Sequence, residues 1–148
     1  MIIAFINCSK TKKPYQCKAE EMYSDSHLFY LSKQYAEKLK VDDIFILSCK
    51  YGLLNREDII EPYNETLAGS KKQKQIEYGE RVYKQLIEQK WFDKVRQIHF
   101  ITSEPYHWRL IELLEPYNIP IVVHTKGLGM GYKIQFLKTQ ISRQKKLF

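Results

Sequence analysis

Four short apolar runs recur along the chain, each about five residues long and rich in β-branched or aromatic side chains. They are IIAFI (2–6), IFILS (44–48), IHFIT (98–102) and IPIVV (119–123). Nearly continuous apolar runs of this length are typical of strands that are buried on both faces of a parallel sheet. The pattern therefore predicts a sheet of about four parallel strands.

The segments between these runs carry apolar residues at helical spacing. Hydroxyl and carboxylate side chains are preferred at helix N-caps, and proline is tolerated in a first helical turn. On these grounds the helices are predicted to start at Ser24 or Asp25, at Ser70, at Pro105 and near Met130. The first two are expected to end near Lys40 and Gln89.

The predicted element order is βαβαβαβα, which favours a three-layer α/β/α fold with a mainly parallel sheet. Because no low-complexity linker or internal repeat interrupts the pattern, we expect one α/β domain over 1–148. Ligands of such sheets bind beyond the carboxyl ends of the strands. The segments at that edge are 7–13, 49–67, 103–109 and 124–133, and they are polar, aromatic or rich in glycine. We therefore expect the functional site there.

The segment after the first strand, NCSKTKK (7–13), combines short polar side chains with lysines. Such a loop suits phosphate or another anion, because backbone amides approach the ligand and cations neutralise it. It lacks the spacing of a phosphate-binding Walker loop, and a solvated basic turn is the alternative. The candidate ligand-binding residues are Asn7, Cys8, Ser9, Lys10 and Thr11.

The segment 49–67 is long for a compact domain, and such a loop is typical of a lid or a binding loop. Tyr51 and Tyr63 are candidates to stack on a base, and Lys50 is a candidate to meet a phosphate or a developing negative charge. Glu61 is the candidate general base or stabiliser of a cationic transition state. The alternative is that the aromatic residues cover the end of the sheet. The remaining binding candidates of this region are Ser48 and Gly52.

The two later loops carry weaker signals. Glu104 is a second carboxylate at the expected edge, or it interacts with the dipole of the helix that follows. His107 and Trp108 are expected to be packing residues. Gly127 and Gly129 give backbone amides the freedom to face an anion at a helix N-terminus, although the spacing is not that of a dinucleotide fingerprint and a flexible turn is the alternative.

The charge of the chain favours an anionic partner. It has 24 Lys and Arg residues against 17 Asp and Glu residues, which gives a net charge of +7. A nucleotide, a modified nucleobase or a nucleic acid fits this balance. The basic C-terminal residues Arg143, Lys145 and Lys146 are interpreted as a solvated end, with a nucleic-acid contact as the alternative.

Other classes of protein are disfavoured by what the sequence lacks. No apolar run approaches the roughly 20 residues of a membrane span, and the first residues do not read as a signal peptide, so we expect a cytoplasmic protein. The cysteines Cys8, Cys17 and Cys49 have no CxxC spacing, and the four histidines are scattered. We expect no metal and no cofactor.

Three motifs in order resemble a known group of proteins. CSKTK (8–12), SCKYGLL (48–54) with IIEPYNETL (59–67), and GLGMGYKIQFLK (127–138) resemble small bacterial and phage domains of uncharacterised function. More distantly, the layout is similar to the YaaA-like peroxide-stress family and to a domain associated with archaeosine synthase. The resemblance implies DNA, RNA or a modified base as the subject, and relatives in this wider group have been likened to base-excising glycosylases.

These observations give two main functional hypotheses. The first is a nucleobase- or nucleotide-processing enzyme, an N-glycosidase-like hydrolase or transferase, in which Glu61 and Lys50 are catalytic. The second is a non-catalytic module that binds a nucleotide or nucleic acid through the same edge. A third hypothesis, a scaffold partner in a phage or host complex, uses that edge as an interface.

Overall fold

A five-stranded sheet lies at the centre of the computed structural model, which describes residues 1–147. The strand order is β4–β3–β1–β6–β7, in which β4 is antiparallel to β3 and the other neighbours are parallel. The strands are β1 (Ile2–Asn7), β3 (Asp43–Ser48), β4 (Gly52–Asn55), β6 (Gln97–Ile101) and β7 (Ile121–Val123). The chain is therefore a mixed α/β protein with a mostly parallel sheet.

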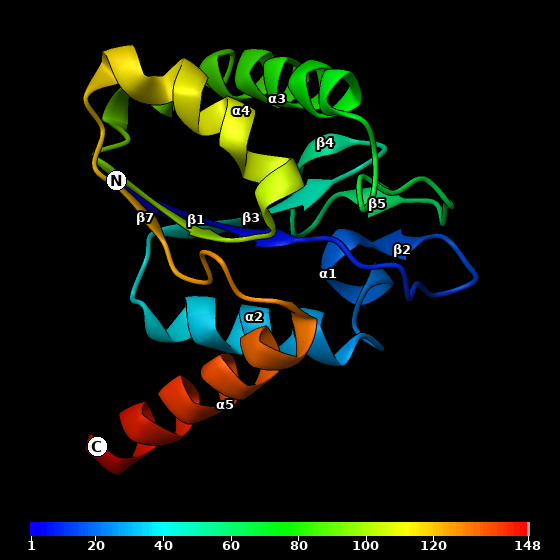
Figure 1. The fold of residues 1–148 in the computed structure, drawn as a ribbon, viewed down its shortest axis with the longest axis vertical. Coiled ribbons are helices and arrows are strands. Elements are labelled where there is room, and N and C mark those ends of the chain that lie inside the picture. Colours follow the sequence, from blue (N-terminus) through cyan, green and yellow to red (C-terminus); the bar gives the residue numbers. More distant parts are fainter. Residues whose placement is uncertain (148) are drawn as a thin grey trace.

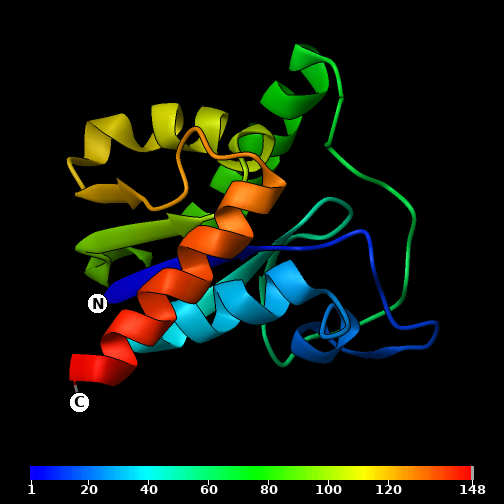
Figure 2. The ribbon, with the colours of Figure 1, turned by 60° about the horizontal axis from the view of Figure 1, so that its bottom comes forward.

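Helices lie on both sides of this sheet, α3 and α4 on one side and α2 and α5 on the other (Figure 1). α5 crosses and packs against α2 (Figure 2). The helices are α1 (Ala19–Met22), α2 (His27–Lys38), α3 (Lys72–Ile87), α4 (Glu104–Leu114) and α5 (Met130–Leu147). The short elements are the 3₁₀ turns η1 (Phe92–Lys94) and η2 (Glu115–Tyr117) and a small antiparallel pair, β2 (Cys17–Lys18) with β5 (Ile59–Ile60).

The four predicted strands are confirmed as the parallel part of the sheet, and the predicted strands and helices alternate in the expected order. The sequence did not predict β4, which adds a fifth strand to this sheet, or the short elements β2, α1 and β5. The additional strand β4 follows β3 through a tight turn, in which Gly52 has a φ of +73°. The four residues GLLN are too short to show an alternating pattern, and they form a strand because they pair with the edge of β3. The predicted loop 49–67 therefore contains β4 and β5.

The starts of α4 and α5 agree with the prediction within one residue, whereas α2 and α3 begin two or three residues beyond the predicted positions. The N-cap of α2 is Ser26, whose hydroxyl accepts a hydrogen bond from the backbone N–H of Phe29 at 3.2 Å. The predicted cap Ser24 instead donates its hydroxyl to the carbonyl of Glu21. Ser70 donates to the carbonyl of Leu67, and α3 begins two residues later. Each hydroxyl stabilises a local turn in place of the helix end, which is a common competing use of serine.

The core is centred on β1, whose residues Ile3 to Ile6 are fully buried. Phe5 is in register with Phe45 of β3 and with Phe100 of β6. Its ring stacks on that of Phe100, with 5.1 Å between centroids, and lies 6.2 Å from that of Phe45. Parallel strands that are covered on both faces require such continuous apolar runs, which explains why this part of the fold is readable from the sequence.

A chain of hydrogen bonds through two histidines links β6 and the end of β7 to α2. His99 Nδ1 and His124 Nε2 are 2.8 Å apart, and His124 Nδ1 is 2.7 Å from the hydroxyl oxygen of Tyr35. Burial lowers the pKa of His99, and burial together with the neighbouring His99 lowers the pKa of His124 to about 4. Two neutral imidazoles satisfy this chain of hydrogen bonds, because each ring has one donor and one acceptor nitrogen.

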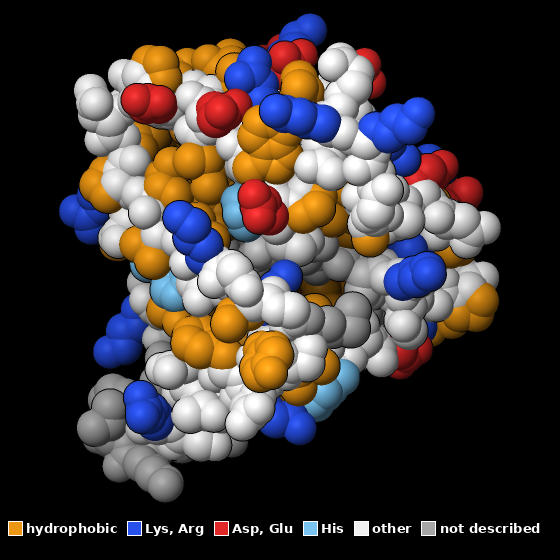
Figure 3. Space-filling view, viewed as in Figure 1, with side chains coloured by type: hydrophobic (Ala, Val, Ile, Leu, Met, Phe, Trp, Pro, Cys, Tyr) orange, Lys and Arg blue, Asp and Glu red, His pale blue; other side chains and the backbone are white. Residues whose placement is uncertain are grey.

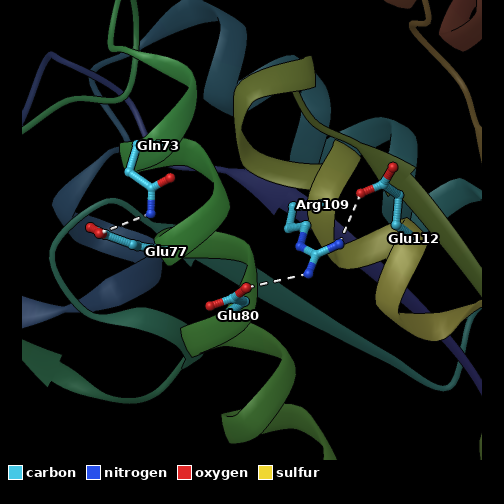
Figure 4. Close-up of polar contacts among 5 residues, drawn as sticks. All are labelled: Gln73, Glu77, Glu80, Arg109 and Glu112. Carbon is cyan, nitrogen blue, oxygen red and sulfur yellow. Dashed lines mark hydrogen bonds and ion pairs between the residues drawn. The ribbon is translucent and has the colours of Figure 1, made fainter.

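The packing of α3 on α4 depends on a glycine. A Cβ atom at Gly79 would lie 2.5 Å from Cβ of Arg109, so only glycine allows the helices to approach this closely. Arg109 forms ion pairs with Glu80 on α3 at 3.3 Å and with Glu112 on its own helix at 3.1 Å (Figure 4). Nearby on α3, the side-chain amide of Gln73 donates a hydrogen bond to the carboxylate of Glu77. These polar contacts are exposed and contribute little, so close backbone packing holds the helix pair together.

We predict that Gly79→Ala lowers the free energy of unfolding by about 1 to 3 kcal/mol, because the added methyl group forces α3 away from α4. The matched control is Gly131→Ala, another helical glycine, where an added Cβ meets nothing within 4 Å. Urea denaturation measures both variants. Equal or greater stability of Gly79→Ala than of Gly131→Ala would show that the helices do not depend on this close contact.

Candidate functional site

The carboxyl ends of the four parallel strands β3, β1, β6 and β7 lie at one edge of the sheet. The chain leaves β1 toward β3 on one side and later returns to β6 on the other, so the loops that follow β1 and β6 diverge. Such a point is the usual ligand-binding position of an open α/β sheet. Asn7 Oδ1 joins the two loops by accepting hydrogen bonds from the N–H of Ser103 at 3.1 Å and from its hydroxyl at 3.4 Å.

A buried network of hydroxyl groups lies just beyond the end of β3. The hydroxyls of Ser48 and Tyr63 are 2.8 Å apart, and those of Tyr63 and Tyr23 are 2.7 Å apart. Tyr78 donates its hydroxyl to the backbone carbonyl of Ser48 at 2.8 Å. The network therefore ties α3 and the segment 61–67 to the end of a central strand.

A second branch of buried polar groups lies beside this network. Tyr106, from α4, accepts hydrogen bonds from the thiol of Cys8 at 3.5 Å and from the backbone N–H of Leu67 at 3.4 Å. Burial raises the pKa of Tyr106 and of Tyr78, and it does the same for Cys49. These side chains are consequently neutral hydrogen-bonding groups at physiological pH and do not supply an anionic nucleophile.

Lys12 brings a partly buried charge to the same place. Its ammonium group lies 4.4 Å from the centre of the Tyr63 ring, a distance suited to a cation–π contact. Burial lowers the pKa of Lys12, and the nearby Cys8, Cys49 and Glu65 act in the opposite direction. The hydroxyl network is thus bordered by a lysine from the loop after β1.

The adjoining surface is hollowed into a pocket of about 460 Å³, which we call the carboxyl-edge pocket. Its lining consists of Cys49, Lys50, Glu65, Leu67, Lys74, Glu77, Tyr78 and Arg81. Arg81 is fixed at the pocket wall because its guanidinium donates to the backbone carbonyls of Lys50 at 2.9 Å and Cys49 at 2.6 Å. Three cationic and two acidic side chains therefore surround an aromatic and aliphatic surface.

The predicted residues of the first loop lie outside the carboxyl-edge pocket. Ser9 donates its hydroxyl to the carbonyl of Thr11 at 2.7 Å, so its oxygen is engaged within the loop. Lys10 and Thr11 are exposed, and the ammonium of Lys12 donates a hydrogen bond to the backbone carbonyl of Lys10. Anion binding by these residues stays a prediction.

The structure brings the predicted residues of the second loop together. Tyr51 meets Tyr63 edge to face with 5.7 Å between ring centres, and the ammonium of Lys50 lies 5.4 Å from the Tyr51 ring. Tyr63 is buried and its hydroxyl is engaged, which supports the alternative that it covers the end of the sheet. Among these residues, Lys50 is the one that lines the pocket.

The predicted catalytic carboxylate, Glu61, is exposed and does not line the carboxyl-edge pocket. Its backbone is held by the hydroxyl of Tyr51, which accepts from the Glu61 N–H at 3.3 Å. Gly127 and Gly129 are exposed, and they too lie outside this pocket. The roles of these three residues stay predictions.

A second pocket, of about 400 Å³, lies between the first turns of α3 and α4, and we call it the tryptophan pocket. Its lining is Lys72, Gln75, Glu104, Pro105 and Trp108. Trp108 was expected to be a packing residue, and this is only partly so, because its ring is half-buried and lines the pocket. His107 is buried, and its Nδ1 is 2.7 Å from the Thr102 hydroxyl.

Several residues of the carboxyl-edge pocket were not predicted from the sequence. Lys74, Tyr78 and Arg81 are spaced by four and three residues, so they share one face of α3. This spacing indicates that the three side chains lie together on a helix, but two cationic residues at such spacing are also typical of a solvated helix surface. Glu65 lies within the motif IIEPYNETL (59–67), but the sequence favoured Glu61 of the same motif; Glu65 lies in the pocket because the hydroxyl of Tyr63 anchors its segment.

The described residues were compared with two further kinds of feature, a metal site and a membrane span. Within 1–147, no group of three or more His, Cys, Asp or Glu side chains is placed to hold a metal ion. No helix in the same range combines the length and apolar character of a membrane span. The side chains of Lys145 and Lys146, which the sequence suggested as nucleic-acid contacts, lie outside the described part of the structure.

Comparison with known proteins places the chain within a protein family. The model of a family of unknown function matches residues 3–139, which is most of the sequence. No curated protein gives a significant match. No solved structure does so either.

We predict that Tyr63→Phe lowers the free energy of unfolding by about 1 to 3 kcal/mol, because Ser48 and Tyr23 lose a buried hydrogen-bond partner. Tyr132→Phe, at an exposed tyrosine, is the control and should change stability by less than about 0.5 kcal/mol. Hydrogen exchange should become faster in 61–67 in the Tyr63 variant. Unchanged exchange there would show that the hydroxyl network does not anchor the segment.

Proposed function

The chain belongs to the DUF6884 family, and we propose that it is an enzyme that processes a nucleotide or a modified nucleobase in the carboxyl-edge pocket, at the N-glycosidic bond. The observation that carries the proposal is the composition of this pocket. The cationic side chains of Lys74 and Arg81 and the carboxylate of Glu65 line one pocket, together with an aromatic and aliphatic surface. Glycosidic chemistry on an anionic substrate needs these three kinds of group in one place.

The cationic groups suit the phosphate of a nucleotide. The guanidinium of Arg81 is held by two backbone carbonyls, so it is presented to a ligand without further ordering. Lys50 and Lys74 are exposed, and the ammonium of Lys74 donates to the backbone carbonyl of Thr66 at 3.3 Å, which holds this charge beside Glu65 in the pocket lining. The net charge of +7 adds a long-range attraction for anions, which salt weakens.

The acid–base role in the proposal goes to Glu65. The carboxylate takes a proton from water, the water oxygen bonds to the anomeric carbon, and the bond between that carbon and the base nitrogen breaks. Lys50 stabilises the negative charge of the departing base, and the base then receives the proton that Glu65 took from the water, which regenerates the carboxylate. The motif-based candidate Glu61 is four residues earlier, outside the pocket lining, and serves as the natural comparison.

The non-catalytic binding module is the second candidate. The observation in its favour is that both Glu61 and Glu65 are exposed to solvent. A carboxylate in contact with bulk water lacks the dry surroundings in which electrostatic catalysis is strongest. In that case the cationic groups bind the ligand, and no bond is broken.

The two candidates are separated by a chemical assay. The protein is incubated with a panel of nucleosides, nucleotides and oligonucleotides that includes modified bases, and mass spectrometry detects released bases. We predict that the wild type releases a base, and that Glu65→Gln lowers turnover by about 10²- to 10⁴-fold while ligand affinity is retained. Glu61→Gln, which makes the same change in the same loop, should retain turnover.

Each contrary result has a defined meaning. Loss of turnover in Glu61→Gln with normal activity in Glu65→Gln would return the catalytic role to the motif residue. Binding of a panel member without any product would favour the non-catalytic module. Absence of binding to every panel member would contradict both candidates.

A further inference from the structure

The tryptophan pocket is suited to an unpaired base. The indole ring of Trp108 is half-buried, and its Nε1 donates to Gln75 Oε1 at 2.8 Å, so the ring is held in one orientation. Pro105 adds a second apolar wall. A fixed aromatic plane beside an apolar wall is the arrangement on which bases stack in proteins that bind single strands.

The charged groups of this pocket fit the remainder of a nucleotide. The ammonium of Lys72 lies 5.6 Å from the centre of the Trp108 ring, and its exposed side chain can move to a phosphate. Glu104 is the acidic residue in the lining, and its carboxylate can accept a hydrogen bond from an exocyclic amine. Figure 3 shows hydrophobic side chains next to Lys or Arg side chains over the α3–α4 layer.

The two pockets flank the first three turns of α3. Lys72 and Gln75 line the tryptophan pocket, whereas Lys74 and Arg81 line the carboxyl-edge pocket. At 3.6 residues per turn, these two pairs point roughly 140° apart around the axis of the helix. Because Tyr78 and Val82 are buried on the side of α3 between them, a strand that joins the two pockets passes over the exposed N-terminal end of this helix.

We propose that the protein binds single-stranded nucleic acid across the start of α3, with one nucleotide in the carboxyl-edge pocket and a nearby base stacked on Trp108. This inference rests on the proposed function for the occupant of the first pocket. It adds that the substrate is a strand and not a free nucleotide. The strand must be single, because a base inside a duplex does not expose a face for stacking on a side chain.

The surface between the pockets has the charge that such a strand requires. Lys71, Lys72 and Lys74 are exposed at the beginning of α3, and no acidic residue lies in the first turn of this helix. Phosphate groups passing over these residues would be neutralised by flexible cations that read no sequence. The arrangement therefore predicts affinity that depends on strand length and salt more than on base identity.

The experiment compares a nucleoside monophosphate with a single-stranded hexanucleotide of the same base, by calorimetric titration at one salt concentration. The hexanucleotide should bind at least tenfold more tightly to the wild type. Trp108→Ala should weaken the affinity for the hexanucleotide by about 5- to 100-fold and change the affinity for the monophosphate by less than about twofold. Lys72→Ala replaces an exposed side chain, so the fold should be retained. This variant should weaken the affinity for the hexanucleotide alone, by a smaller factor.

Fluorescence provides a readout that a loss of folding would not mimic. The other tryptophan, Trp91, is partly buried and stacks on the core residue Phe45 at 4.8 Å, so quenching by the hexanucleotide should come from Trp108 and disappear in Trp108→Phe. The strand inference is overturned if the monophosphate and hexanucleotide bind equally and Trp108→Ala weakens neither, a result that leaves the proposed function intact. If neither ligand binds, both proposals fail together.

Discussion

The hydroxyl group of Tyr63 is the contact on which the arrangement of the site depends. It bonds the Ser48 hydroxyl at the end of β3 and the Tyr23 hydroxyl beyond α1, so three distant parts of the chain meet at one oxygen. A buried hydroxyl that lacks a partner costs about 1 to 3 kcal/mol, which makes this geometry strongly preferred. Because segment 61–67 is tied down here, Glu65 is brought to the wall of the carboxyl-edge pocket.

The other wall of that pocket comes from helix packing. Gly79 lets α3 lie close against α4, and Tyr78 then reaches the carbonyl of Ser48. One face of α3 is thereby fixed beside the end of β3, with Arg81 aimed at the loop that follows the strand. The same close approach leaves a second hollow between the starts of the two helices, beside Trp108. Both pockets are consequences of how this one helix is positioned.

The sequence revealed the parts of the fold that are governed by local patterns. Continuous apolar runs identified the parallel strands, and the segregation of polar loops correctly indicated which segments share an edge. The strand β4 was missed because a four-residue edge strand has no pattern of its own. The pocket was predicted only in part: Lys50 follows a strand and was visible, whereas Glu65 and Arg81 are placed by contacts with residues more than ten positions away. Such contacts leave no local signal.

A nucleotide in the carboxyl-edge pocket would be seen most directly in a crystal structure of the protein soaked with a nucleoside monophosphate. We predict a phosphate in contact with the side chains of Lys74 and Arg81, with the base against the pocket surface near Leu67 and Tyr78. A nucleotide bound at another edge of the sheet, or an empty pocket at saturating nucleotide concentration, would contradict this prediction.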